Sequence, residues 1–307
     1  MVIAGPTGSG KSQAALAIAR RLDGVIVNAD ALQVYRDLRI LSARPVPAEE
    51  AAVPHRLYGF VSATEAWSAA KHLESARAVL DAIWRAGQTP VIVGGTGLYI
   101  RALERGLAHV PPIPEHVRRR WREALAARGP AALHAELAER APHEAARLRP
   151  GDSQRLVRAL EVLDATGQPL SAFQAQGDAN AALAGVETVR LAILPERTAL
   201  YRAIDDRFER MMADGALDEA RAVMSVAPDE ALPARRAVGL PPLVAHLEGR
   251  LPLADAVEQA KRDSRNYAKR QMTWIRGQMQ HFTAVPSAAA AIETLDEGWP
   301  DGVPERP

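Results

Sequence analysis

Short apolar runs that end in glycine-rich or polar turns recur in the first third of the chain. Residues 2–4, 25–27 and 90–93 form three such runs, and none of them alternates between apolar and polar positions. Stretches with apolar residues at spacings of three and four lie between and after them, and predict helices, for example at residues 66–86. Runs of this kind are typical of strands buried on both faces, so the pattern predicts a parallel sheet covered by helices.

The first apolar run leads directly into a glycine-rich turn that contains a lysine. It matches the pattern G-x-x-x-x-G-K-[ST] between a strand and a helix, with the residues Gly5, Pro6, Thr7, Gly8, Ser9, Gly10, Lys11 and Ser12. In such a P-loop, backbone N–H groups and the helix N-terminus surround a polyphosphate. We expect Lys11 to neutralise phosphate oxygens and Ser12 to hold Mg²⁺, the expected cofactor. The motif predicts a diphosphate or triphosphate site and leaves open whether ATP binds there.

The pattern changes near residue 111, where the sequence Pro-Pro-Ile-Pro resembles a stiff linker. From residue 115 to about 173 every apolar run has helical spacing, and a strand pattern returns at 189–194. The predicted fold class is therefore α/β, with a P-loop NTPase-like parallel sheet core and a helical insertion domain. We expect the core at 1–112 and 186–282, the insertion at 113–185, and a mobile, acidic, proline-containing tail at 283–307. Within the second part of the core, helices are predicted at 198–214, 216–226 and 253–281.

Composition narrows the chemistry that the chain can carry. Among 307 residues, 38 are basic, 37 are acidic and 48% are hydrophobic, which excludes extensive disorder. The absence of cysteine removes disulfides, thiolate nucleophiles and cysteine-bound metals. Neither a leader sequence nor a membrane-spanning run is apparent, so we expect a monomeric cytoplasmic protein without membrane contact.

Two polar residues follow the second and third apolar runs, at the strand ends where ligands bind in parallel sheets. Asp30 stands where an ordinary nucleotide-binding enzyme has the acid that supports Mg²⁺. Thr96 lies in the turn Gly-Gly-Thr-Gly at 94–97 and, from its position alone, favours a cap on the following helix. These residues alone are compatible with a kinase of a nucleoside or another small molecule.

Five further segments carry a more specific signal. They are Asp-Ala-Leu-Gln-Val-Tyr-Arg at 30–36, Gly-Gly-Thr-Gly-Leu-Tyr at 94–99, Asp-Ser-Gln-Arg-Leu-Val-Arg-Ala-Leu-Glu-Val at 152–162, Arg-Ala-Val-Gly-Leu at 236–240 and Arg-Asn-Tyr-Ala-Lys-Arg-Gln-Met-Thr-Trp at 265–274. With the P-loop, their order and spacing resemble bacterial-type tRNA dimethylallyltransferases over residues 2–282. The chain departs from that family at 40–45, where Ile-Leu-Ser-Ala-Arg-Pro replaces Ile-Gly-Thr-Ala-Lys-Pro, and at 55–56, where His-Arg replaces a histidine pair. These departures leave the contacts of residues 40–56 open.

The resemblance implies transfer of the dimethylallyl group from dimethylallyl diphosphate to N6 of adenosine 37, next to the anticodon. The tRNAs would be those that read codons beginning with U, and pyrophosphate would be released. In this reaction the P-loop, with Mg²⁺ on Ser12, would hold the leaving diphosphate. Asp30 would take the proton from N6, Thr96 would position the same nitrogen, and Arg118 would lie near the substrate and the diphosphate.

A base in the anticodon loop must be unstacked before it can react, so cations that bind the tRNA backbone are needed around the pocket. The resemblance implies tRNA contacts for Asp30, Ala31, Leu32, Gln33, Thr96, Arg118, Gln154, Arg155, Leu156, Val157, Arg158, Arg236 and Gly239. Residues 261–276 also hold six cations and one acid. A basic stripe along one face of this helix is predicted to contact the tRNA backbone, with Arg262, Arg265 or Asn266, Lys269, Thr273 and Arg276. We expect Tyr267, Met272 and Trp274 to serve packing.

Three hypotheses therefore compete: a tRNA prenyltransferase, a P-loop kinase whose insertion acts as a lid, and a non-catalytic RNA-binding module that binds a nucleotide. Such kinases rarely need a basic terminal helix or so large an insertion. A binding module would have no use for Asp30 and Thr96 opposite the phosphate site. Transfer to free AMP is a variant of the first hypothesis, and the predicted tRNA contacts disfavour it. We predict the tRNA prenyltransferase.

Overall fold

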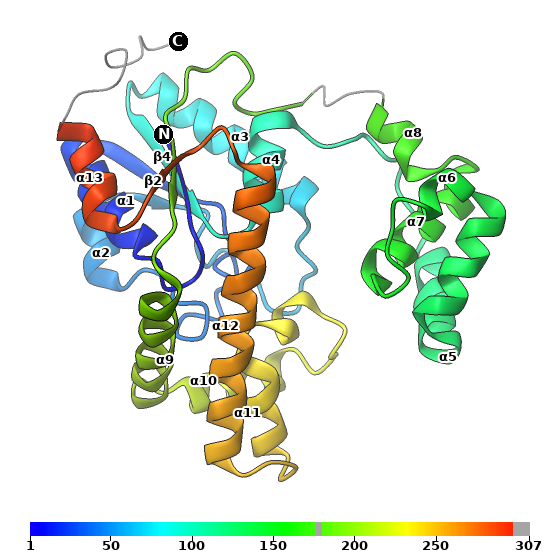
Figure 1. The fold of residues 1–307 in the computed structure, drawn as a ribbon. Coiled ribbons are helices and arrows are strands. Elements are labelled where there is room, and N and C mark those ends of the chain that lie inside the picture. The colour runs from blue at the N-terminus through cyan, green and yellow to red at the C-terminus, as the bar shows by residue number, and fades with distance from the viewer. Residues whose placement is uncertain (176–179, 297–307) are drawn as a thin grey trace. The chain divides into compact units, whose positions relative to one another are not determined.

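The computed structural model describes residues 1–175 and 180–296 (Figure 1). Within them, six strands form one sheet in the order β3-β2-β4-β1-β5-β6, and every neighbouring pair is parallel. The strands are β1 (Val2–Ala4), β2 (Gly24–Asn28), β3 (His55–Arg56), β4 (Thr89–Gly94), β5 (Arg190–Ile193) and β6 (Thr283–Val285). Every residue of β1 and β2 is buried, so both faces of the sheet are covered, as the unalternating apolar runs predict. The α/β fold class is confirmed.

The described residues divide into two compact units. The first contains the sheet and runs from Met1 to Glu104 and again from Ala182 onward. Its helices are α1 (Lys11–Arg21), α2 (Pro47–Ala52), α3 (Ala69–Arg85), α4 (Gly97–Arg105), α9 (Arg197–Ala213), α10 (Ala216–Val226), a 3₁₀ helix (Pro233–Arg236), α11 (Leu240–Leu247), α12 (Leu253–Gln278) and α13 (Ala288–Asp296). The bounds of α3, α9, α10 and α12 lie close to the predicted helices at 66–86, 198–214, 216–226 and 253–281, whereas α2, α11 and α13 were not predicted.

The second unit, within Arg105–Ala181, is helical in its described part. Its helices are α5 (Glu115–Arg140), α6 (Pro142–Ala145), α7 (Ser153–Thr166) and α8 (Leu170–Ala175). Trp121 is 1% exposed at the centre of its core, and its indole N–H donates to Asp164 at 2.8 Å. The burial of so large a side chain with its polar atom satisfied indicates that this unit has a core of its own.

The expectation of a mobile tail from residue 283 is wrong for residues 283–296. Strand β6 pairs with β5, and α13 packs against α1, where Ala291 is fully buried. Strand β6, Thr-Ala-Val, begins with a polar residue and has two exposed positions, and the acids and prolines that follow it suggested solvent exposure. Residues 297–307, the rest of that predicted tail, lie outside the described residues. None of the described helices is long and apolar enough to cross a membrane.

Candidate active site

The order of the strands brings three predicted segments together at one edge of the sheet. Strand β4 lies between β1 and β2, with Ala4 paired with Gly94 and Asn28 with Val93. The P-loop follows β1, Asp30 follows β2 and Thr96 follows β4. The carboxyl ends of parallel strands lie at the same edge of the sheet. The three segments that follow these neighbouring strands therefore lie side by side.

The eight predicted P-loop residues form the turn between β1 and α1. Gly10 precedes the helix with a φ of +84°, a left-handed conformation that a side chain would strain. Lys11 is 9% exposed, and its Nζ donates to the carbonyl oxygen of Pro6 at 3.3 Å. Burial lowers the pKa of Lys11 to about 8; the charge of Asp30 opposes this shift and that of Arg207 adds to it. Lys11 therefore remains a cation at neutral pH.

Asp30 and Thr96 are held by hydrogen bonds between the ends of β2 and β4. The backbone N–H of Asp30 donates to Oδ1 of Asn28 at 2.8 Å, and Oδ1 of Asp30 accepts the N–H of Leu32 at 3.0 Å. Thr96 Oγ1 accepts the N–H of Ala31 at 3.0 Å. The hydroxyl of Thr96 thus ties its own turn to the Asp30 segment, an interaction that a helix-capping role alone does not explain.

Three residues that the sequence analysis did not assign to the site also meet there. The phenol of Tyr267 lies near Thr96 and lines the same cleft as Asp30. Gln271 accepts the N–H of Thr7 and donates to the carbonyl oxygen of Gly95, both at 2.8 Å, so it joins the P-loop to the glycine-rich turn. Tyr267, which was expected to serve packing rather than base stacking, is partly buried and also lines the cleft.

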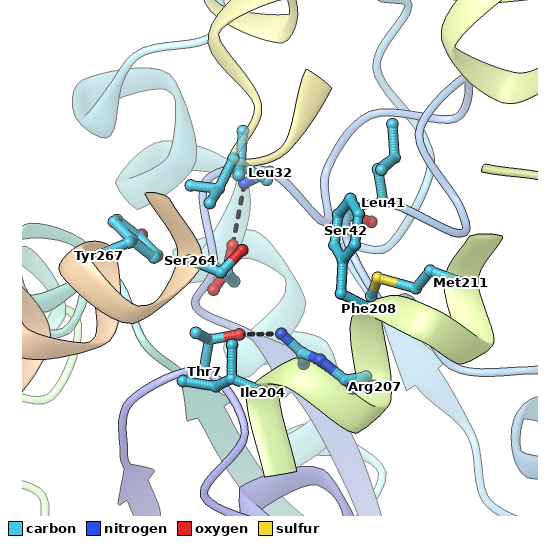
Figure 2. A pocket seen from close by; sticks show the side chains of 12 residues that line it. Thr7, Leu32, Leu41, Ser42, Ile204, Arg207, Phe208, Met211, Ser264 and Tyr267 are labelled. Atoms are coloured by element: carbon cyan, nitrogen blue, oxygen red, sulfur yellow. Dashed lines mark hydrogen bonds between the residues drawn. The ribbon is translucent and has the colours of Figure 1, made fainter. Parts of the chain in front are cut away.

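Arg207, on α9, is the third of these residues. Its guanidinium donates to the hydroxyl of Thr7 (Figure 2). Burial lowers the pKa of Arg207 to about 10, while the charge of Asp30 acts in the opposite direction. Two cations, Lys11 of the P-loop and Arg207 next to it, therefore both interact with the charge of Asp30.

A cleft opens beside these groups. It is lined by Thr7, Asp30, Leu32, Leu41, Ser42, Ile204, Arg207, Phe208, Met211, Val238, Ser264 and Tyr267. Figure 2 shows Leu41, Phe208 and Met211 gathered on one side, with Tyr267 and Ser264 opposite and the pair Thr7 and Arg207 below. The cleft therefore has a cationic end at the P-loop and an apolar side wall.

The neighbourhood of Arg207 in the sequence explains why the residue was missed. It lies between charged residues of α9 that are mostly exposed, which is typical of a solvated helix face. The position of Tyr267 in the sequence could have indicated that it belongs to the site. Tyr267 and Gln271 are four residues apart on α12 and so share a face, separate from the exposed Arg262 and Lys269.

The helical unit holds another group of predicted residues. Gln154 and Arg155 are exposed on α7, as a role in tRNA contact requires. Arg118 and Arg158 lie close enough for their charges to interact, and burial is the main cause that lowers the pKa of Arg158. The Nε of Arg118 is buried and has no partner among the described residues. Arg118 belongs to this unit, whereas the P-loop, Asp30 and Thr96 belong to the other.

The burial of Leu156 corrects its predicted tRNA contact, whereas the contact predicted for Gly239 stays a prediction. The side chain of Leu156 is fully buried in the core of the helical unit, with Val157 packed partly against the same core. Gly239 is buried at the start of α11 with a φ of +88°, and a Cβ there would lie 2.8 Å from Phe208. Both residues therefore serve folding, whereas Arg236 is exposed.

Gln33 and part of the basic stripe have structural partners. The amide of Gln33 donates to the carbonyl oxygens of Ser42 and Ala43, at 3.0 and 2.8 Å. On α12, Arg265 pairs with Asp205, and the buried Lys261 pairs with Glu209 and Glu258. The exposed members of the stripe are Arg262, Asn266, Lys269, Thr273 and Arg276. The surface available to a polyanion on α12 is therefore narrower than the count of charges indicated.

The residues fit Mg²⁺ only in company with a polyphosphate. Among the described residues, no three His, Asp or Glu side chains gather in a way that could hold a metal ion. Mg²⁺ usually keeps several waters and binds through one or two protein oxygens and the phosphates. Ser12, exposed in the first turn of α1, and Asp30 suit that arrangement.

His72 is a packing residue: it stacks on Tyr99, and burial lowers its pKa to about 4.

Comparison with known proteins agrees with this arrangement. The sequence profile described as IPP transferase matches residues 33–278, well over half of the chain, and one described as Isopentenyl transferase matches residues 1–60. The chain belongs to the IPP transferase family. This IPP transferase family member is 51% identical over 279 residues to a tRNA dimethylallyltransferase of Rhodospirillum centenum, covering 91% of this chain and 88% of that protein. It is 48% identical to a tRNA dimethylallyltransferase of Methylocella silvestris, and the match covers 95% of this chain and 96% of that protein.

Solved structures of similar proteins share the fold of this IPP transferase family member. The tRNA isopentenylpyrophosphate transferase of Bacillus halodurans has a TM-score of 0.65 at 30% identity, covering 93% of this chain and 88% of that chain. A eukaryotic dimethylallyltransferase, captured acting on tRNA, has a TM-score of 0.77 at 25% identity. The match covers 93% of this chain and 73% of that chain. The family assignment thus favours the prenyltransferase over the kinase hypothesis.

Proposed function

We propose that this IPP transferase family member transfers the dimethylallyl group of dimethylallyl diphosphate to N6 of adenosine 37 in tRNA. The observation that carries the proposal is the meeting of the P-loop and Asp30 at one cleft with an apolar wall, with Thr96 bonded to the residue next to Asp30. A kinase site also needs a phosphate cradle and an acid. An apolar wall next to the cradle suits a hydrocarbon group attached to a diphosphate better than the polar acceptor of a kinase.

The cationic end of the cleft suits a leaving diphosphate. Negative charge grows on the diphosphate as its bond to the allylic carbon breaks, and Lys11 and Arg207 would offset that charge. Thr7, hydrogen-bonded to both Arg207 and Gln271, would hold the P-loop in the shape that receives the diphosphate. Mg²⁺, held through Ser12 and the phosphates, would supply further stabilisation of the same charge when bound.

Asp30 suits the role of the base. The exocyclic amine of adenine is a weak nucleophile, so its proton must be removed as the new C–N bond forms. One carboxylate oxygen of Asp30 is occupied by the N–H of Leu32, which fixes the side chain beside the cleft. Thr96, held by the N–H of Ala31, would position the amine next to the base.

The exposed basic residues and the family to which the chain belongs both support tRNA as the partner. Arg155 on α7 and the exposed basic residues of α12, among them Lys269, could neutralise backbone phosphates. Arg118 and Arg158 form a second basic pair on the helical unit. Adenosine 37 as the target, tRNAs that read codons beginning with U, and Mg²⁺ as the cofactor are parts of this proposal.

The proposal is tested by incubating the purified protein with Mg²⁺ and unmodified tRNA that carries adenosines at positions 36 and 37. Dimethylallyl diphosphate and ATP are supplied in separate reactions, and a third reaction replaces tRNA with AMP. We expect pyrophosphate release and a five-carbon addition to tRNA only with dimethylallyl diphosphate. Hydrolysis of ATP without prenyl transfer, or transfer to AMP and not to tRNA, would overturn the proposal.

A further inference from the structure

A single carboxylate on α10 holds the loop that forms part of the apolar wall. Glu219 accepts the backbone N–H groups of three consecutive residues, Arg39, Ile40 and Leu41, at 2.7, 2.7 and 2.8 Å. Consecutive N–H groups that converge on one anion form a nest, and bonds to a charged acceptor are stronger than neutral ones. Almost 180 residues of sequence separate the two partners, so the contact fixes tertiary position rather than local conformation.

The same loop is held from its other side by Gln33. The amide of Gln33 donates to the carbonyl oxygens of Ser42 and Ala43, so the N–H groups and the carbonyl groups of the loop are bound by different elements. Ala43 has a φ of +52°, a left-handed conformation that alanine rarely adopts. A strained residue of this kind persists only where the surrounding contacts determine it, and Glu219 and Gln33 supply such contacts.

The loop matters because two of its residues line the cleft. Leu41, 6% exposed, and Ser42 face the site together with Phe208 and Met211 (Figure 2). Leu41 is itself one of the residues whose N–H is bound by Glu219. The position of the carboxylate therefore determines how far this wall stands from the P-loop end of the cleft.

We propose that Glu219 is a positioning residue that sets the size of the allylic group accepted by the cleft. It acts through Leu41 and Ser42, and it favours a five-carbon over a ten-carbon allylic diphosphate. The inference rests on the proposed function. The segment it concerns, residues 40–45, is one of the two in which this chain departs from the pattern of the family.

The test compares Glu219→Gln with Asp218→Asn, which removes the same charge from the neighbouring residue of α10. Asp218 is a suitable control because its side chain is 81% exposed and pairs only locally with Arg221. In Glu219→Gln one oxygen can still accept the N–H groups of Arg39 and Ile40, whereas the new NH₂ group faces the N–H of Leu41 and cannot accept it. Initial rates are measured with tRNA and either dimethylallyl or geranyl diphosphate.

For Glu219→Gln we expect the KM for dimethylallyl diphosphate to rise about tenfold, with a smaller change in kcat. The kcat/KM preference for the five-carbon over the ten-carbon substrate should fall about tenfold, and Asp218→Asn should match the wild type. Amide hydrogen exchange at residues 39–41 should accelerate only in Glu219→Gln. An unchanged preference, or an equal loss of rate with both substrates, would overturn the proposal.

Leu41→Ala keeps the proposal testable if Glu219→Gln does not fold. It enlarges the wall directly and leaves the backbone N–H groups bound to Glu219. The same loss of preference is expected, and an unchanged preference would overturn the proposal. A wild-type chain that transfers neither allylic group would refute the proposed function itself, whereas an active wild type with unaltered variants would refute only this inference.

Discussion

Replacement of Arg207 by Gln tests the electrostatics of the site most sharply. The guanidinium contacts Thr7 of the P-loop, and its charge acts on both Asp30 and Lys11. Loss of one donor aimed at charge that develops in the transition state costs about 3 kcal/mol, or roughly 10²- to 10³-fold in rate. We therefore expect the single-turnover rate of prenyl transfer in Arg207→Gln to fall by that factor at saturating tRNA and dimethylallyl diphosphate.

The same substitution should also change the dependence of activity on pH. Arg207 is one of the causes that lower the pKa of Lys11 to about 8, so its removal should raise that pKa and move the alkaline loss of activity upward. Single-turnover rates measured by rapid quench report the loss of stabilisation, and kcat/KM for dimethylallyl diphosphate between pH 6 and 10 reports the pKa of Lys11 in the free protein. Arg202→Gln, an exposed arginine on the same helix, is the matched control. A rate for Arg207→Gln within about threefold of wild type would refute the reasoning.

Four further predictions concern other residues of the account. Asp30→Asn keeps an acceptor for the N–H of Leu32 but cannot take a proton; the rate of transfer should fall by about 10²–10⁴ with unchanged tRNA affinity, and a wild-type rate would exclude Asp30 as the base. Lys11 loses its charge as the pH rises through about 8. The affinity for dimethylallyl diphosphate, measured by calorimetry, should therefore fall up to about tenfold per pH unit above that value. An affinity that does not change with pH would contradict the assigned pKa. Tyr267→Phe removes only the phenolic hydroxyl, which lies near Thr96, from the lining of the cleft, so kcat should fall about tenfold while the KM for the diphosphate is unchanged; a change in KM alone would show a packing role. Arg155→Gln should weaken tRNA binding and lower the slope of log Kd against log salt by about one; if only kcat changes at saturating tRNA, the assignment to backbone contact is wrong.

The central sheet was largely predictable because its strands carry a local pattern. Strands β1, β2, β4 and β5 are buried on both faces, and continuous apolar runs mark them in the sequence. Strands β3 and β6 have the sequences His-Arg and Thr-Ala-Val and are partly exposed, so no continuous apolar run marks them. Their pairing depends on the edges offered by β2 and β5, which only the assembled sheet provides.

The candidate site was predictable where a motif and a strand end coincide. The P-loop, Asp30 and Thr96 fall on adjacent strands because of the order of the sheet, and each follows an apolar run. Arg207 and Gln271 reach the P-loop from 200 and 264 residues away in the sequence, and no local pattern encodes such contacts. Leu156 shows the opposite error: a motif residue was assigned to a surface role, although its helical spacing with Leu160 indicated the core.

The position of the modified nucleoside gives the most direct test of the central claim. An anticodon stem-loop with adenosines at 36 and 37 is incubated with the protein, Mg²⁺ and dimethylallyl diphosphate, then cleaved to fragments and analysed by mass spectrometry. A second stem-loop carries guanosine at position 37 only. The account predicts one five-carbon addition, located at position 37 of the first stem-loop and absent from the second. Addition at another position, or equal modification of both stem-loops, would contradict it.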